Sequence, residues 1–381
     1  MSLAKTPSSP GMQRARILLL IPHLGGGGAE RVAAHLARGL SSDKYEVHLG
    51  LVTQTGAGLE EWPSTVALHG LGAPRVRAAA LRLLHCVWQL EPDLILSGIF
   101  HLNFLVLLLR PFFPRKTRLL VRQNATVSAA LTFENHPRFT RLLYRLLYRH
   151  AARVICQTPA TAEDLAAELG IARQRLAVLD NPVDVEEIRR AASAQPSLWT
   201  GPGPHLLAVG RLAREKGFDL LLRAMAAVRR QFPNADLILA GDGPQRTPLE
   251  SAARALGIED AVRFAGRVDP PYAYFPGAAL FVLSSRHEGM PNALLEAAAA
   301  GLPIVALPAS QGIVDLLRGQ PGAWLAADLS AEALASALLA ALRDFQPGQR
   351  FAHPFIEEFR IERALENYEH LIDEVLRERQ P

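Results

Sequence analysis

The segment SSRHEGMPNALLEAAAAGLPIVA, from Ser284 to Ala306, places two glutamates, Glu288 and Glu296, on either side of a Gly-Met-Pro turn. The run LFVLSS that leads into it is continuously apolar, which is typical of a strand buried in a parallel sheet. The alanine-rich run after the turn predicts a helix, because Pro291 suits the first helical turn, where an N–H has no intrahelical partner. One carboxylate therefore lies just before a helix, and the other lies about one turn inside it.

This position suits ligand binding, because ligands of open α/β sheets bind at the carboxyl ends of the strands. A helix that begins near Met290–Asn292 points free backbone N–H groups and the positive end of its dipole at that edge, which favours phosphate. Carboxylates accept hydrogen bonds from sugar hydroxyls. The alternative is that Glu288 caps the helix and Glu296 is a solvated surface residue. The apolar flanks of Glu296 argue against solvation, since a carboxylate in such a helix must be buried and partnered.

Apolar strand-like runs alternate with helical runs along the chain, which predicts α/β domains with parallel, doubly wound sheets. The alternation stops at Asn181–Asp184, and a polar, proline-containing stretch follows, so we predict a linker near residues 182–203. Strands are expected at 16–22, 45–52, 93–100, 118–124 and 152–158, and then at 206–210, 236–243, 262–268, 280–285 and 303–307. The predicted domains are residues 1–185 and 186–355, and residues 356–381 form a charged amphipathic helix.

The bulk composition is that of a folded protein of two domains, with 381 residues, 49% hydrophobic and 20% charged. The two cysteines, Cys86 and Cys156, have neither disulfide nor metal-ligand spacing, and no metal site is expected. The apolar run Ile17–Pro22 is too short for a signal peptide, and Leu102–Leu109 is too short to span a bilayer. These features predict a cytoplasmic protein.

The net charge of +4 is unevenly distributed. Residues 1–185 contain 21 Lys and Arg against 13 Asp and Glu, a charge of +8, whereas the remainder contains 20 against 24, a charge of −4. A basic first half favours an anionic surface as a partner. Nucleic acid is not expected as a partner, because no nucleic-acid motif accompanies the basic residues.

A basic amphipathic helix is predicted in the first half. Leucines lie between four arginines at helical spacing, namely Arg138, Arg141, Arg145 and Arg149. With the run RPFFPRKTR at 110–118, this helix is a candidate for contact with anionic lipid. An ordinary surface helix that packs on the sheet is the alternative.

Two cations follow a strand in VGRLAREKGFDLLLRA, from Val209 to Ala224. Arg211 and Lys216 lie in the loop between this strand and a helix, at the sheet edge that also receives the glutamate-bearing turn. An arginine binds phosphate oxygens in a bidentate manner and a lysine acts as a point charge, so together they suit a diphosphate. The alternative is that both are solvated loop charges. Their position at the same sheet edge as the glutamate-bearing turn argues against it.

A run of four glycines, Gly25–Gly28 in LGGGGAERV, lies between a strand and a helix and allows a ligand to approach the backbone closely. The run does not match the dinucleotide fingerprint Gly-x-Gly-x-x-Gly, because Glu30 takes the place of the last glycine. A simple tight turn is the alternative. His101, Arg122 and Asn124 follow other strands of the first half and are candidates to line an acceptor pocket, with a structural role as the alternative.

The motifs together resemble the retaining GT-B glycosyltransferases of family 4, also described as glycosyltransferase group 1. The resemblance rests on GGGGAERV, NPVD, VGRLAREKGFDLLLRA, AGDGP, VRFAGRV and the Glu-x7-Glu segment, which together span nearly the whole chain. It implies two Rossmann-like domains that face each other across a cleft. It also implies that the helix in 356–381 packs back on the N-terminal domain.

The resemblance implies a role for each candidate residue. Arg211 and Lys216 would neutralise the diphosphate of a nucleotide-sugar, Glu288 would hold the donor sugar as the third catalytic residue, and Glu296 would bind the ribose. The other nucleotide contacts implied are Gly26, Gly27, Gly28, Val268, Gly289, Met290, Pro291, Asn292 and Leu295. Many members carry a histidine near the donor sugar, at the end of an N-terminal strand where this chain reads VRQN. In this chain the place of that histidine is taken by His101, by a main-chain group or by no group.

The function implied is transfer of a sugar from a nucleotide-sugar, with a UDP-sugar favoured, to a saccharide or lipid-linked saccharide in lipopolysaccharide or polysaccharide synthesis. The nucleotide-sugar is a substrate, and neither a cofactor nor a metal is expected. A GDP-mannose-dependent mannosyltransferase and a catalytically inactive nucleotide-sugar-binding scaffold are the alternatives. Peripheral contact with the cytoplasmic face of the inner membrane is a further expectation.

Overall fold

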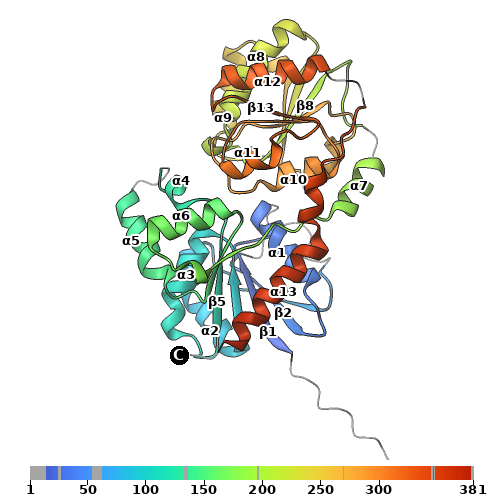
Figure 1. The fold of residues 1–381 in the computed structure, drawn as a ribbon. Coiled ribbons are helices and arrows are strands. Elements are labelled where there is room, and N and C mark those ends of the chain that lie inside the picture. The colour runs from blue at the N-terminus through green and yellow to red at the C-terminus, as the bar shows by residue number, and fades with distance from the viewer. Residues whose placement is uncertain are drawn as a thin grey trace, which may run out of the picture.

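The chain forms two parallel β-sheets, each covered by helices on both faces (Figure 1). The computed structural model describes residues 14–24, 27–53, 62–132, 136–194, 197–268, 270–344, 346 and 348–378. All pairings between named strands in these residues are parallel. The predicted fold class, two doubly wound α/β domains in succession, is therefore confirmed.

The first sheet has seven strands in the order β3-β2-β1-β4-β5-β6-β7. Its strands are β1 (Ala15–Ile21), β2 (Tyr45–Leu51), β3 (Val66–Gly70), β4 (Leu94–Ser97), β5 (Arg118–Gln123), β6 (Arg153–Cys156) and β7 (Leu176–Val178). Strand β1 is an interior strand, between β2 and β4, and its residues Ile17–Ile21 are buried, as expected for a strand covered on both faces of the sheet.

The second sheet has six strands in the order β10-β9-β8-β11-β12-β13. Its strands are β8 (His205–Val209), β9 (Asp236–Ala240), β10 (Val262–Gly266), β11 (Leu280–Leu283), β12 (Ile304–Ala306) and β13 (Ala323–Leu325). In both sheets the chain winds outward in one direction and then restarts next to the first strand. The resulting switch points, between β1 and β4 and between β8 and β11, are where ligands bind in open α/β sheets.

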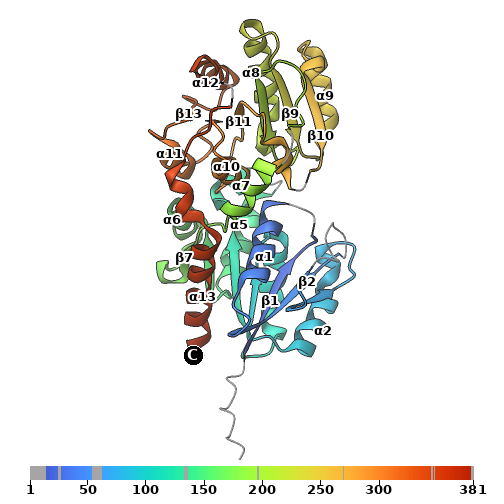
Figure 2. The same ribbon diagram turned by 90° about the vertical axis from the view of Figure 1, so that its right-hand side faces the viewer.

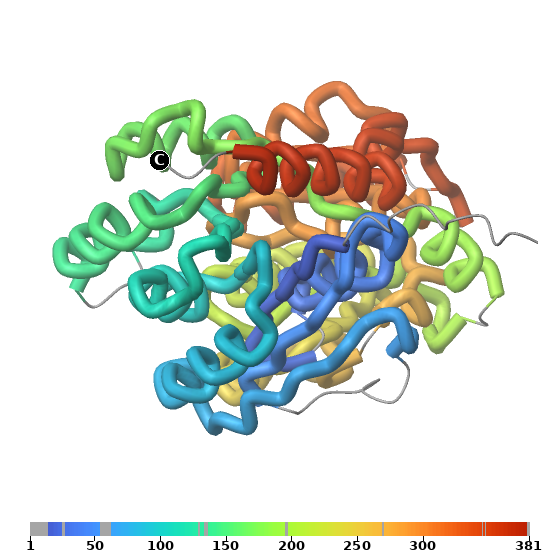
Figure 3. Tube along the Cα trace, turned by 90° about the horizontal axis from the view of Figure 1, so that it is seen from below, coloured from blue at the N-terminus to red at the C-terminus, as the bar shows by residue number. Residues whose placement is uncertain are grey.

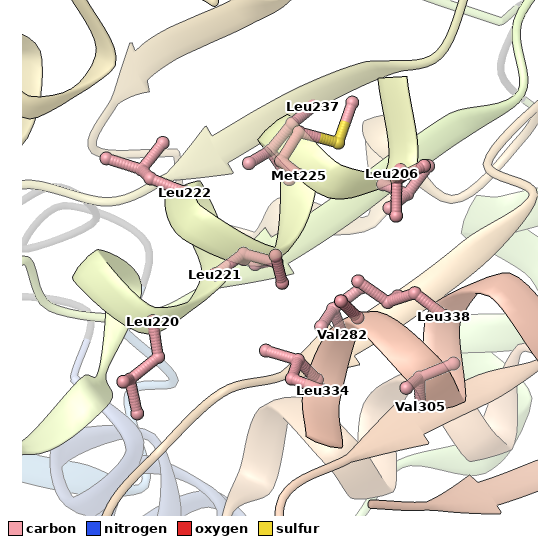
Figure 4. Close-up of a cluster of buried hydrophobic side chains, with 14 of the residues drawn as sticks. Leu206, Leu220, Leu221, Leu222, Met225, Leu237, Val282, Val305, Leu334 and Leu338 are labelled. Atoms are coloured by element: carbon pink, nitrogen blue, oxygen red, sulfur yellow. The ribbon is translucent and has the colours of Figure 1, made fainter. Parts of the chain in front are cut away.

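Helices of one domain pack on the two faces of its own sheet and create two apolar cores per domain. In the second domain, α8 (Phe218–Gln231), α9 (Arg246–Ala255) and α12 (Ala331–Asp344) cover one face. Figure 4 shows how Leu221 and Met225 of α8 and Leu334 and Leu338 of α12 meet strand residues such as Val282. The other face receives α7 (Val185–Ala194), α10 (Asn292–Ala299) and α11 (Gln311–Leu317).

In the first domain, one face is covered by α2 (Ala80–Leu90), α3 (Phe100–Leu109), α4 (Val127–Thr132), α5 (Pro137–Tyr148) and α6 (Pro159–Leu169). The opposite face receives α1 (Gly28–Gly39) and the C-terminal helix α13 (Ile361–Arg377). Helix α13 buries Tyr368, Ile372 and Val375 against this sheet. Figures 2 and 3 show it running along the first domain after the chain has left the second. The predicted return of the final helix is therefore confirmed.

The two domains are connected twice, by segments that lie side by side. Val183, on the way out of the first domain, accepts a hydrogen bond from Ile361 N–H and donates its own N–H to Phe359 O, at 3.0 and 2.9 Å. The domain boundaries at 185/186 and 355/356 stay predictions. Among the helices of the described residues, none combines the length and the mean hydropathy that a membrane-spanning segment requires.

Candidate functional site

The switch point of the second sheet brings together the segments that follow β8 and β11. Arg286 N–H donates to Glu215 O at 2.8 Å, and Ser284 Oγ donates to Lys216 O at 2.9 Å. These bonds form because β8 and β11 are neighbours in the sheet and both loops leave the same edge. Residues that are about 70 positions apart in sequence therefore share one surface.

Lys216 and Glu288, both predicted catalytic residues, are in direct contact. Lys216 Nζ lies 2.5 Å from Glu288 Oε1, and the same oxygen accepts a hydrogen bond from Ser285 Oγ at 2.7 Å. Only 12% of the Glu288 side chain and 24% of the Lys216 side chain are exposed. Because a buried carboxylate is costly without a partner, Lys216 fixes the position of Glu288 at the strand tip.

Arg211 lies on the same loop, but its guanidinium points elsewhere. It is 69% exposed and contacts Glu215 Oε1 at 2.6 Å. In the described part of the chain no ion pair joins Arg211 to Glu288. The structure therefore brings together two of the three predicted catalytic residues and leaves Arg211 in solvent nearby on the loop.

Gly217 makes this close approach of the two loops possible. Its backbone has a φ of +60°, and a Cβ placed on it would lie 2.1 Å from Ser284 O. Only glycine fits here, because it adopts the left-handed conformation without strain and has no Cβ to collide with Ser284 O. The Lys-Gly pair in LAREKGFD thus has a geometric reason, since Gly217 allows Lys216 to lie next to the tip of β11.

The turn that starts helix α10 is packed against the first domain. A Cβ at Gly289 would lie 2.2 Å from Asn124 O, and Met290 N–H donates to Gln157 Oε1 at 2.9 Å. The Met290 amide, expected to hold phosphate, is therefore bound to the protein in this conformation. Sequence reasoning missed Gln157, although it follows β6 in the same way that Asn124 follows β5.

Glu296 is buried, as its apolar flanks indicate, with 5% of its side chain exposed. Its partner is Arg31 of the first domain, whose Nη1 donates to Glu296 Oε1 at 2.8 Å (α1 and α10 in Figure 1). Tyr272 lines the same small cavity as Arg31 and Glu296. Sequence analysis missed Arg31, although it lies within the quoted run GGGGAERV, one helical turn after the glycines.

The surroundings of Glu296 are nearly filled. The cavity that it lines has a volume of about 10 Å³ and is bordered by residues of both domains, among them Arg31, His35, Tyr272 and Asn292. Burial raises the pKa of the Tyr272 hydroxyl, and the Glu296 charge raises it further. Burial lowers the pKa of His35 to about 4, with Asp184 opposing the decrease and Arg31 and Arg38 adding to it. His35 is therefore neutral at pH 7.

The glycine loop reaches the second domain through its last residues. Asn292 Nδ2 donates to Gly28 O at 2.7 Å, and a Cβ on Gly28 would lie 2.9 Å from the same nitrogen. A Cβ on Gly27 would lie 2.2 Å from the Glu30 carboxylate, so that glycine leaves room for an acidic side chain. Gly25 and Gly26 lie outside the described residues. The loop thus approaches the N-terminus of α10, where the diphosphate was predicted.

Arg122 is at the centre of a buried polar network between the domains. Its guanidinium donates to Tyr368 OH at 3.1 Å, to Asn124 Oδ1 at 2.6 Å and to Asn181 Oδ1. Asn181 in turn donates to Met290 O at 3.1 Å and to Asn292 Oδ1. With 2% exposure, Arg122 joins the linker, α13 and the start of α10. Its predicted contact with an acceptor stays a prediction and requires Arg122 to leave these partners.

The remaining predicted residues lie at different depths. His101 is exposed in the first turn of α3, because β4 ends at Ser97, earlier than expected. Val268 is half-buried after β10 and packs on the core of the second domain. Leu295 is fully buried in that core, so its side chain does not face solvent. Pro291 has extended backbone and directly precedes α10.

His287 is a further titratable group next to the Lys216–Glu288 pair that sequence reasoning did not select. Burial lowers the pKa of its imidazole, Glu288 raises it and Lys216 lowers it. Among the described residues, no group of three or more His, Cys, Asp or Glu side chains is arranged to hold a metal ion.

Two family models match the chain, one on each domain. The model described as Glycosyltransferase Family 4 matches residues 26–187, and the model described as Glycosyl transferases group 1 matches residues 203–344. The first range contains all of the first sheet apart from β1, and the second contains all of the second sheet.

Curated relatives carry the same activity class in their names. An uncharacterized glycosyltransferase of Haemophilus influenzae is 36% identical over 120 residues, 32% of this chain and 34% of that protein. The N-acetylgalactosamine-N,N'-diacetylbacillosaminyl-diphospho-undecaprenol 4-alpha-N-acetylgalactosaminyltransferase of Campylobacter jejuni is 28% identical over 78% of this chain and 82% of its own length. The lipopolysaccharide core biosynthesis glycosyltransferase LpsE of Rhizobium meliloti is 28% identical over 73% and 75%.

Among solved structures, Anabaena HepE in complex with UDP and glucose superposes with a TM-score of 0.75. The alignment covers 94% of this chain and 99% of that chain, at 19% sequence identity. At this identity the likeness concerns the fold, and it extends over both domains.

We predict that Gly217→Ala destabilises the protein more than Gly319→Ala does. Both glycines have a φ of +60 to +70°, but nothing lies within 4 Å of a Cβ at Gly319. An alanine in left-handed backbone costs about 1–2 kcal/mol at either site, and displacing Ser284 O adds about 1–3 kcal/mol at Gly217 only. Equal melting temperatures for the two variants in calorimetry would contradict the close packing described.

We also predict that His35 weakens the fold in acid. Because its pKa falls from 6.5 in the unfolded chain to about 4, its contribution is fully present above pH 6.5 and is lost as the pH falls toward 4. The stabilisation that His35 loses on acidification is on the order of 3 kcal/mol in the free energy of unfolding. Denaturant titrations measure the free energy of unfolding at pH 7 and at pH 4.5. Between these two pH values it should fall less in His35→Gln than in the wild type or in the control His370→Gln, in which an exposed histidine is replaced. Identical losses in all three proteins would show that His35 is not buried as described.

Proposed function

We propose that this chain, whose two domains match the models described as Glycosyltransferase Family 4 and Glycosyl transferases group 1, transfers a sugar from a nucleoside-diphosphate sugar to a saccharide or lipid-linked saccharide. The single observation that carries this proposal is the Lys216–Glu288 contact at the switch point of the second sheet. There an ammonium suited to phosphate touches a carboxylate suited to sugar hydroxyls, at the edge where such sheets bind ligands.

The donor would lie along the edge formed by the β8 loop, the β11 loop and helix α10. Lys216 and the exposed Arg211 would neutralise the diphosphate, because both lie on the β8 loop and Arg211 is free to turn from Glu215. The N-terminus of α10 adds the positive end of its dipole, and the amides of Asn292 and Ala293 precede the first hydrogen bond of the helix, which Leu294 N–H donates to Pro291 O. Glu288 would accept hydrogen bonds from the donor sugar, and Glu296 would accept them from the ribose.

The chemical step would proceed with retention at the anomeric carbon. The acceptor hydroxyl oxygen bonds to that carbon on the face from which the diphosphate departs, while the bond between the carbon and the phosphate oxygen breaks. The departing phosphate oxygen takes the proton of the acceptor hydroxyl. Arg211, Lys216 and the helix terminus stabilise the charge that develops on the diphosphate, and this electrostatic term replaces a metal ion in the proposed mechanism.

A UDP-sugar is the favoured donor and GDP-mannose is the second candidate. The relatives support an acceptor of the lipid-linked or lipopolysaccharide type, since one is named for an undecaprenol diphosphate substrate and another for lipopolysaccharide core synthesis. A catalytically inactive scaffold remains the alternative that the experiments below separate from the enzyme.

Helix α5 of the first domain supports contact with a lipid surface. Arg138, Arg141, Arg145 and Arg149 are exposed on or just beyond it. Between them, Phe139 is 60% exposed and Leu142 50% exposed, and Phe112 after α3 is 61% exposed. A helix with cations and large apolar side chains on its solvent side binds the interface of an anionic membrane. We propose that this surface holds the enzyme at a membrane that carries its acceptor.

We predict that Lys216→Ala lowers turnover by about 100-fold or more, which is typical of removing one charge-stabilising donor. Release of UDP, GDP or ADP is measured over a panel of nucleotide-sugars, with Arg254→Ala, an exposed cation of α9, as the control. Normal turnover in Lys216→Ala would mean that the diphosphate does not bind there. In parallel, a nucleotide at 100 times its dissociation constant should stabilise the fold by about 2.7 kcal/mol. Stabilisation without turnover of any donor would favour the scaffold.

We predict that the wild type co-sediments with anionic lipid vesicles and that the double variant Arg138→Glu/Arg145→Glu does so far less. Each arginine near the surface contributes about 1 kcal/mol, or about fivefold in affinity. Neutral vesicles and the variant Arg254→Glu serve as controls for charge and for position. Unchanged sedimentation of the double variant would exclude α5 as the docking helix.

A further inference from the structure

We propose that Arg31 acts as an interdomain latch on the nucleotide site, because it occupies the carboxylate that the donor ribose requires. The inference rests on the proposed function, since Glu296 is the ribose ligand in that proposal. Arg31 and Glu296 are 265 positions apart in sequence and belong to different domains. Their contact therefore reports directly on whether the domains are together.

The geometry of the pair is that of a buried ionic contact. Arg31 Nη1 lies 2.8 Å from Glu296 Oε1, with 20% and 5% of the two side chains exposed. Tyr272 and Asn292 of the second domain line the same small cavity as Arg31, so the guanidinium lies among residues of the second domain. Removing one partner from such a pair leaves the other charge buried and uncompensated, which makes the domain contact sensitive to this pair.

The pair leaves no space for a nucleoside. The cavity between Arg31, Tyr272, Asn292 and Glu296 has a volume of about 10 Å³, which is close to the least that holds one water molecule. A ribose reaches Glu296 only after the two domains separate and the guanidinium leaves. The donor therefore competes with Arg31 for the same carboxylate.

The exchange is chemically matched. A ribose presents two hydroxyl donors, and a carboxylate accepts both, as it accepts N–H groups of a guanidinium. Neighbouring contacts, such as Asn292 with Gly28 O and Met290 N–H with Gln157, connect neutral groups across the same interface and break in the same movement. Because part of the population is latched, the apparent affinity for nucleotide falls by the fraction of molecules that are open.

The test measures domain opening and nucleotide binding in the full-length protein. Small-angle scattering without ligand should give a larger radius of gyration for Arg31→Gln and for Glu296→Gln than for the wild type, with Arg31→Lys in between. The double variant should be no more open than Arg31→Gln, because both changes break one contact. Calorimetric titration with UDP should give about threefold or greater tightening in Arg31→Gln and weakening in Glu296→Gln.

The outcomes separate the latch from the proposed function. If Arg31→Gln scatters as the wild type does, or if the wild type binds a nucleotide and Arg31→Gln binds the same nucleotide no more tightly, Arg31 does not latch the site. If neither UDP, GDP nor ADP binds the wild type while Arg31→Gln is more open, the proposed nucleotide function fails and the interdomain contact stands. Circular dichroism checks that each variant is folded. Should Arg31→Gln not fold, the comparison of Arg31→Lys and Glu296→Gln with the wild type decides the matter.

Discussion

The structure depends on the need to partner two buried carboxylates of one segment, Glu288 and Glu296. A buried carboxylate is costly unless a cation or hydrogen-bond donors lie next to it. Lys216 partners the first, because the order of the second sheet places the β8 loop beside the tip of β11. Arg31 partners the second, because the two domains are in contact. The partners of this one segment therefore depend both on the strand order of the second domain and on the contact between the two domains.

These partnerships explain how the segment that we propose as the donor site keeps its charged groups paired within the protein. In the absence of a ligand, the lysine and the carboxylates satisfy each other or are satisfied by the first domain, and the Met290 amide is satisfied by Gln157. A nucleoside diphosphate with a sugar at each end offers equivalent partners, namely phosphates for the cations and hydroxyls for the carboxylates. Binding then becomes an exchange of partners rather than the filling of an open cavity.

The sequence predicts well what local chemistry decides. Continuous apolar runs mark the central strands, and strand-tip reasoning brings Lys216 to Glu288. Sequence analysis does not predict the edge strands β3 and β13, because most of their residues are exposed or only partly buried. It also misses Arg31 and Gln157, whose roles arise from contact between domains and have no periodic signature. Arg122 is drawn into the buried interface for the same reason, whereas Leu295 belongs to the core because α10 is apolar around its axis.

The most direct test is a crystal structure of the protein with UDP. The account predicts a diphosphate beside Lys216, a ribose on the Glu296 carboxylate and Arg31 withdrawn from it. A nucleotide bound elsewhere, or bound while the Arg31–Glu296 contact remains intact, would contradict the central claim that the acidic segment after β11 is the donor site.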